Sequence, residues 1–321
     1  METTTATGSA KSKGFAMKMP LLMLSCLLAL SGVAAAQTNI VVSMAKFDDK
    51  FLTILRNSVE SAAKTSSDLS LKVSDAKEDS SAQIEQVRQA VADKADAIIM
   101  VAVDGKSGEA AAKMTAEAGI PLVFLNRRPS IDSFGGKVAI VSSNDLVAGR
   151  LQARVLSDKL SGKGKVAILI GDPAQSAAQD RTKGVKEVLA KISGMEIVKE
   201  ETAHWDRKEA EQLVSSWIAG GVKLDAIAAN NDEMALGAIA AIKKAGLSGK
   251  VLVAGVDGTA DAVAAIESGD QFLSVLQNAK AQGAQAVADA KSLAGGNYAQ
   301  QYDWVPYELI IKDNAEQYAA K

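Results

Sequence analysis

The feature that most constrains the fold is a regular alternation of two patterns from Thr38 onward. Short runs rich in Val and Ile are followed by longer stretches whose apolar residues recur at helical spacing, as Leu52, Leu55 and Val59 do within 50–65. Buried strands that are each followed by a helix are typical of a parallel sheet covered on both faces. Roughly ten such steps over about 285 residues are too many for one open sheet, so the pattern predicts two doubly wound α/β lobes.

The same pattern predicts where the elements lie. Strands are expected at 39–45, 69–76, 95–103, 120–125, 137–143, 164–172, 195–203, 224–230, 250–257 and 271–277. Helices are expected at 50–65, 81–93, 106–118, 175–192, 206–219, 232–245, 259–267 and 279–294. The segment 303–312 is predicted to be one edge strand.

The N-terminus differs in kind from the rest of the chain. Three lysines precede the apolar run 21–33, which is too short to span a bilayer comfortably and ends in small residues at Ala36. This predicts a cleaved signal peptide over 1–36 and export to the periplasm; a lipoprotein attached through Cys26, the only cysteine, is the alternative. Cleavage would leave a chain without thiols or disulfides.

Polar side chains follow the predicted strands directly. In doubly wound sheets, ligands bind beyond the carboxyl ends of the strands, so these residues are the candidates for a binding site. They are Asp48, Asp49, Asn126, Arg127, Ser143, Asn144, Asp172, Trp205, Asn230, Asn231, Asp257 and Gln277.

The chemistry of this set suits a neutral polyhydroxylated ligand. Carboxylates accept from hydroxyls, amides donate and accept, and arginine offers a planar fork of donors. Because aromatic residues make up only 4% of the chain, Trp205 is interpreted as a platform for an apolar ring face.

Each candidate also has a purely structural interpretation. Asp48 and Asp49 begin a predicted helix, where acids interact favourably with the helix macrodipole. Asn231 precedes a predicted helix and would serve as its N-cap, and Asp257 could simply begin a helix. Arg127 could pair with a neighbouring acid, and Trp205 could pack between the lobes. For Arg128 a solvated or interlobe position is expected, and Trp217, at helical spacing from Leu213, is expected in the core.

The sequence argues against several other functions. The net charge is −2 without long charged runs, so no nucleic-acid partner is expected. His204 is the only histidine, nothing pairs it with a nucleophile, and no group has metal-ligand spacing. The chain is therefore expected to be no enzyme and to carry no metal or cofactor.

Several stretches resemble the periplasmic sugar-binding proteins of the ribose-binding type, the substrate-binding subunits of ABC importers. They are "NNDEMALGAIAAIKKAG", "VAGVDGT" and "QSAAQDRTKG", and the resemblance extends over 38–312. The combination of "DDKFLTILRN", "FLNRRP", "HWDR" and "NNDEMA" is most similar to the subgroup that binds myo-inositol and rhizopines.

This resemblance implies two lobes joined by a three-segment hinge, with crossovers near 143, 277 and 306. The N-terminal lobe would comprise 37–143 and 278–306, and the C-terminal lobe 144–277 and 307–321. The resemblance also implies the ligand-binding residues Asp49, Phe51, Leu52, Asn126, Arg127, Ser143, Asp172, Arg181, Trp205, Arg207, Asn231, Asp257 and Gln277. Four of these residues come from the resemblance alone: Phe51, Leu52, Arg181 and Arg207.

Departures from the ribose-binding pattern favour a cyclitol over a pentose. Asp49 replaces a common asparagine, Leu52 and Val256 stand where rings are frequent, and Asp172 occupies a position that is commonly apolar. The expected function is capture of myo-inositol or a rhizopine by a monomer that delivers it to a permease. A binder of ribose or another monosaccharide, and a ligand module for a chemoreceptor or sensor, remain the alternatives.

Overall fold

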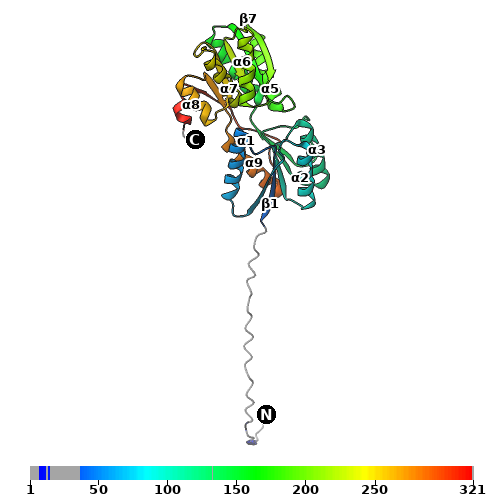
Figure 1. Ribbon diagram of the computed structural model, residues 1–321. Helices are drawn as coiled ribbons and strands as arrows, with labels where there is room; N and C mark the ends of the chain where they lie inside the picture. The colour runs from blue at the N-terminus through cyan, green and yellow to red at the C-terminus, as the bar shows by residue number, and fades with distance from the viewer. Residues whose placement is uncertain (1–6, 12–13, 15–36, 132, 320–321) are drawn as a thin grey trace. The chain divides into compact units, whose positions relative to one another are not determined.

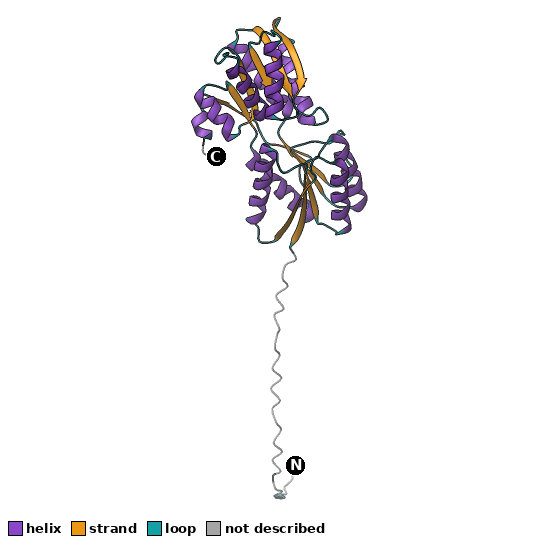
Figure 2. Ribbon diagram, in the orientation of Figure 1, coloured by secondary structure: helices purple, strands orange, loops and turns teal. Residues whose placement is uncertain are grey.

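The strands form two six-stranded sheets, each between layers of helices (Figure 2). The structure is a computed structural model that describes residues 7–11, 14, 37–131 and 133–319. The predicted signal peptide lies almost entirely outside these residues. The chain from Ala36 onward forms one compact unit.

The first sheet is entirely parallel, in the order β11-β5-β4-β3-β1-β2. Its strands are β1 (Thr38–Met44), β2 (Leu69–Asp75), β3 (Ala97–Met100), β4 (Leu122–Leu125), β5 (Val138–Ser142) and β11 (Tyr302–Trp304). Helices α1 (Lys50–Lys64) and α9 (Ala279–Ala294) cover one face (Figure 1). Helices α2 (Ser80–Ala92) and α3 (Gly105–Ala118) cover the other.

The second sheet repeats this arrangement in the order β12-β10-β9-β8-β6-β7. Its strands are β6 (Lys163–Ile170), β7 (Gly194–Thr202), β8 (Ala226–Ala229), β9 (Leu252–Asp257), β10 (Leu273–Leu276) and the antiparallel β12 (Glu308–Ile311). Helices α4 (Asp145–Lys159) and α5 (Ser176–Leu189) pack on one face, and α6 (Arg207–Ala219) and α7 (Asp232–Lys244) on the other. Helix α8 (Ala260–Ser268) packs against the 3₁₀ turn Ala315–Tyr318. The matching strand orders confirm the prediction of two similar doubly wound lobes.

Two details differ from the prediction. The segment 303–312 is not one edge strand, because β11 joins the first sheet and β12 the second, with Pro306 between them. Proline has no backbone N–H to donate, which suits a position between two strands. Helix α4 was not predicted, because its buried face consists of small and polar residues such as Ala148, Gly149 and Gln152 instead of a large apolar stripe.

Candidate functional site

The strand-end residues of both lobes meet in one hydrogen-bonded network. Gln277, just after β10, accepts from Asn126 Nδ2 at 2.9 Å and donates to Asp257 Oδ1 at 2.8 Å. Asn126 follows β4 of the first sheet, and Asp257 ends β9 of the second. The structure therefore brings together three predicted residues from different segments of the chain, all of them buried.

Three of the predicted site residues have strained backbone conformations. Asn126, Trp205 and Asp257 have φ angles of 67°, 65° and 121°, in the region that favours glycine. A residue kept in such a conformation has a free-energy cost of order 1–3 kcal/mol and persists where the surroundings hold it. Each of the three directs a polar or aromatic side chain from a strand end, which is consistent with a functional edge of the sheets.

Arg127 is buried, yet few of its donors are occupied. Among the described residues its guanidinium donates only to the backbone carbonyl of Ala102, at 3.3 Å, and it forms no ion pair. Burial lowers the pKa of Arg127, while the charges of Asp49 and Asp172 act in the opposite direction. Acids from both lobes are thus near enough to act on this cation without contacting it.

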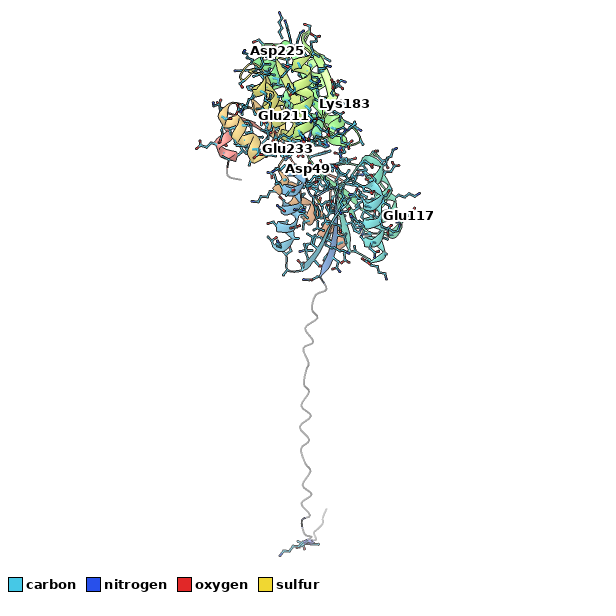
Figure 3. The ribbon with its side chains drawn as sticks, in the orientation of Figure 1. Asp49, Glu117, Lys183, Glu211, Asp225 and Glu233 are labelled. Atoms are coloured by element: carbon cyan, nitrogen blue, oxygen red, sulfur yellow. The ribbon has the colours of Figure 1, made fainter. Side chains whose placement is uncertain are left out.

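Asp49, directly before α1, and Asp172, shortly after β6, are only partly buried. Asp49 caps α1 by accepting from the backbone N–H of Leu52 at 2.8 Å, and Figure 3 labels it at that helix end. Asp172 accepts from the N–H of Ala174 at 2.8 Å. Each carboxylate keeps further acceptor capacity. Phe51, by contrast, is buried with Leu52 in the core between α1 and the first sheet.

Arg181, on α5, has several partners inside the second lobe. It donates to Asp145 at 2.8 Å and to the carbonyl of Asn230 at 2.7 Å, and it lies 3.7 Å from Asp257. Burial disfavours its charge, but Tyr307, Asp145 and Asp257 outweigh that effect and raise the pKa of Arg181. Arg181 therefore acts as a fixed cation beside Asp257.

The indole ring of Trp205 packs so closely against the backbone of Gly171 that no other residue fits at position 171. A Cβ atom on Gly171 would lie 2.2 Å from the indole ring. The indole N–H donates to Gln175 at 2.9 Å, and the Arg181 guanidinium lies 5.8 Å from the ring centroid. The ring is held in place at the carboxyl end of β6, half-buried.

Asn231 and Arg207 both make contacts within the second lobe. Asn231 caps α7 through a 2.9 Å bond from the N–H of Met234, as predicted for its structural role. Arg207 donates to Glu233 and Asp261, each at 2.8 Å. Figure 3 labels Glu233 at the start of α7. The structure does not connect Arg207 by a hydrogen bond to the network of Asn126 and Gln277.

The expected positions of Arg128 and Trp217 are confirmed. Arg128 joins the lobes, because its backbone N–H donates to Ser176 at 3.1 Å and its guanidinium pairs with Asp180, both on α5. Trp217 is buried in the core between α6 and α7. His204 is on the surface, where its ring contacts Glu209 at 2.8 Å.

The sequence interpretation missed several polar residues that support the site. Ser143, which was predicted, accepts from Gln282 Nε2 at 3.0 Å, and Gln282 was not predicted. Tyr307 donates to Asp145 at 2.6 Å. The available signals were weak: a glutamine between Ala281 and Gly283 on α9, and an acid in the first turn of α4.

Asp232 and Asp257 form a buried acidic pair. Burial raises the pKa of Asp257 well above its ordinary value, although Arg181 lowers it. Burial also raises the pKa of Asp232 to about 6, against the hydrogen bonds from Ser274 and Thr259 that favour its charge. Asp232 thereby ties α7 to the loop after β9 and to β10.

Within the described residues, no group of three or more His, Cys, Asp or Glu side chains is arranged to hold a metal. No helix in the same part of the chain is both long and apolar enough to cross a membrane.

The chain has two doubly wound lobes, and polar residues that follow strands of both sheets are hydrogen-bonded to one another. This arrangement is typical of bilobal ligand-binding proteins. The family model for the periplasmic binding protein domain matches residues 40–297. The chain belongs to this family, whose members are extracytoplasmic binding proteins.

Comparison with known proteins shows which members of this class the chain resembles. A Rhizobium meliloti protein named for rhizopine binding is 40% identical over 309 residues, covering 95% of this chain and all of its own length. The structure of an ABC transporter solute-binding protein from Bacillus halodurans, with bound myo-inositol, has a TM-score of 0.84 at 36% identity and covers 89% of this chain and 98% of its own. A Caulobacter myo-inositol-binding protein bound to myo-inositol has a TM-score of 0.80 at 28% identity, with coverage of 87% and 95%.

Proposed function

We propose that this chain is the substrate-binding subunit of an ABC importer and captures a cyclitol, with myo-inositol or a rhizopine as the preferred ligand. The observation that carries the proposal is Arg127, a buried guanidinium with one described acceptor and with Asp49 and Asp172 near enough to affect its pKa. Hydrogen bonds to a charged group contribute about 1.5–3 kcal/mol each, so unused donors of this kind are a strong site for adjacent hydroxyls.

The distribution of donors and acceptors favours a ring with hydroxyls on every side. Arg127 supplies donors from the first lobe, and Asp172 and Asp257 supply acceptors from the second. Trp205 adds an apolar surface for the ring face. The ligands bound by the Bacillus and Caulobacter relatives, together with the name of the Rhizobium protein, support the same choice.

The remaining predicted ligand-binding residues belong to this proposal with different roles. Direct contact is proposed for Asp49, Asn126, Arg127, Ser143, Asp172, Trp205, Asp257 and Gln277. Phe51, Leu52, Arg181 and Asn231 would shape or position the site, since they are buried or engaged in capping and ion pairing. Arg207 would contact ligand only by leaving part of its pairing with Glu233 and Asp261.

Delivery would follow closure of the two lobes around the ligand. The proposed lobes are 37–143 with 278–306 and 144–277 with 307–321, which fits the sheet membership of β11 and β12 and the packing of α9 against α1. Contacts from both lobes would stabilise the closed form relative to the open one. The chain would act as a periplasmic monomer after loss of 1–36, would present the closed form to a permease, and would catalyse no reaction.

Calorimetric titration of the chain from residue 37 with myo-inositol, a rhizopine, ribose, galactose and xylose tests this proposal. One-to-one binding of myo-inositol with the pentoses silent is expected. Tight ribose binding with inositol silent would replace the ligand within the same class. Transport that persists after deletion of the gene, alongside lost chemotaxis toward the bound ligand, would favour the sensor alternative.

A further inference from the structure

The hydrogen bonds of Gln282, on α9, reach three of the residues that the proposed function uses. Its Oε1 accepts from Asn126 Nδ2 at 3.3 Å, and its Nε2 donates to Ser143 Oγ at 3.0 Å and to Gln277 Oε1 at 3.4 Å. Gln282 is fully buried. A buried amide with all of these bonds has a defined orientation, because reversing it would oppose like groups.

The direction of this network is set at Asp257. Its Oδ1 accepts from Gln277 Nε2 at 2.8 Å and lies 3.7 Å from the guanidinium of Arg181, a cation that favours an acceptor at this position. Gln277 must then turn Nε2 toward Asp257 and Oε1 toward Asn126 and Gln282. Gln282 accordingly turns Nε2 toward Gln277 and Ser143, and both glutamine oxygens face Asn126 Nδ2.

The consequence is a defined polarity at the ligand side. Asn126 uses its amide protons within the protein, so it presents Oδ1, and no described residue donates to that oxygen. Ser143 accepts from Gln282, which leaves its hydroxyl proton available. Asn126 would therefore accept from a ligand hydroxyl, and Ser143 would donate to a ligand oxygen.

We infer that Gln282 is a positioning residue that, together with Gln277, holds Asn126 Oδ1 and the Ser143 hydroxyl toward the ligand and so makes the site select for a hydroxyl, not an ether, at Asn126. This inference rests on the proposed function for its ligand. An ether oxygen accepts but cannot donate, so it would leave Asn126 Oδ1 without a partner. With Gln282 replaced, only the bond to Gln277 Oε1 opposes reversal of the Asn126 amide, so a larger fraction of molecules would turn Nδ2 toward the ligand and donate to either group.

The variants are Gln282→Met, which keeps the length of the side chain, and Gln285→Met as the matched control. Gln285 lies on the same helix and donates to Asp289 at 2.9 Å, outside the network. Thermal unfolding of both variants first verifies that they fold.

The first measurement needs no ligand. Hydrogen exchange of the Asn126 side-chain amide, followed by NMR, should be at least tenfold faster in Gln282→Met than in the original protein and unchanged in Gln285→Met. Unchanged exchange in both variants would overturn the inference, whatever the ligand proves to be.

The second measurement compares the affinities for myo-inositol and for its mono-O-methyl ethers. At least one ether should bind more than about tenfold more weakly than myo-inositol in the original protein and in Gln285→Met, a difference of about 1.4 kcal/mol. In Gln282→Met this ratio should fall below about threefold. An unchanged ratio would overturn the inference. Absence of inositol binding to the original protein would instead overturn the proposed function, and the exchange measurement would then decide the role of Gln282.

Discussion

Arg127 is the residue on which ligand affinity should depend most. Replacing it with alanine removes the free donors beside Asp49 and Asp172, and two lost charge-assisted bonds correspond to a loss of affinity of about 100-fold or more. Titration with myo-inositol measures the effect. Arg88→Ala, an exposed residue paired with Glu85 on α2, should bind as the original protein does, and an Arg127→Ala variant of unchanged affinity would contradict the proposed site.

Asp232 should make the stability of the second lobe depend on pH in an unusual direction. Its pKa of about 6 in the folded protein lies above the ordinary 3.8, so the folded state binds more protons between these values. The contribution of Asp232 to the unfolding free energy therefore falls as pH rises through this window, by at most about 3 kcal/mol, and is constant above it.

Urea unfolding of the original protein and of Asp232→Asn between pH 4 and 7 tests this sign. The difference in unfolding free energy between the two proteins should decrease as pH rises. Asp270, whose pKa is lowered mainly by a hydrogen bond from Lys243, titrates below its ordinary 3.8, so the difference for Asp270→Asn should stay nearly constant over most of this pH range. A flat difference for Asp232→Asn would show that this carboxyl does not titrate in the window.

At the scale of elements, the close contact of α4 with α5 holds Arg181 in place. A Cβ atom on Gly149 would lie 1.9 Å from the backbone oxygen of Arg181, and one on Gly184 would lie 2.4 Å from that of Leu146. Gly149→Ala should therefore lower the unfolding free energy by about 1–3 kcal/mol and weaken ligand binding through displacement of Arg181.

Denaturant unfolding and titration of the same variant provide the two measurements. Gly135→Ala is a suitable control, because its added methyl group would meet its nearest neighbour at an ordinary 3.7 Å. If Gly149→Ala kept both its stability and its affinity, the two helices would have room to separate without moving the site.

At the scale of the whole molecule, Arg128 links the loop after β4 to α5 through Ser176 and Asp180. A partly exposed pair of this kind contributes up to about 1 kcal/mol, so Arg128→Ala should shift the lobes toward more open arrangements by up to about fivefold. Small-angle scattering should record a larger radius of gyration without ligand, converging with that of the original protein at saturation. Lys186→Ala, which removes a pair with Glu200 inside one lobe, should leave the radius unchanged.

The sequence by itself determined the architecture and identified the strand ends that carry the candidate site. Runs such as β3 and β8 are buried at every position, and the helices between strands carry an apolar face, so hydrophobic periodicity alone predicts a parallel sheet. Asn126, Asp257 and Gln277 were predicted to share a site because the carboxyl ends of parallel strands lie at one edge. Helix α4 was not predicted, because the small and polar residues on its buried face do not form a periodic apolar pattern.

Only the tertiary structure decided which polar residues contact one another. Gln282 and Asn126 are 156 positions apart, and Tyr307 and Asp145 are 162 apart, so no local pattern indicates either pair. The same applies to Arg127 and Arg181: Arg127 has a single described acceptor, whereas Arg181 donates to Asp145, to the carbonyl of Asn230 and to Tyr307. Periodicity records which face of an element is buried, but the partner of a buried polar group depends on how distant elements pack, and that packing is a property of the folded chain.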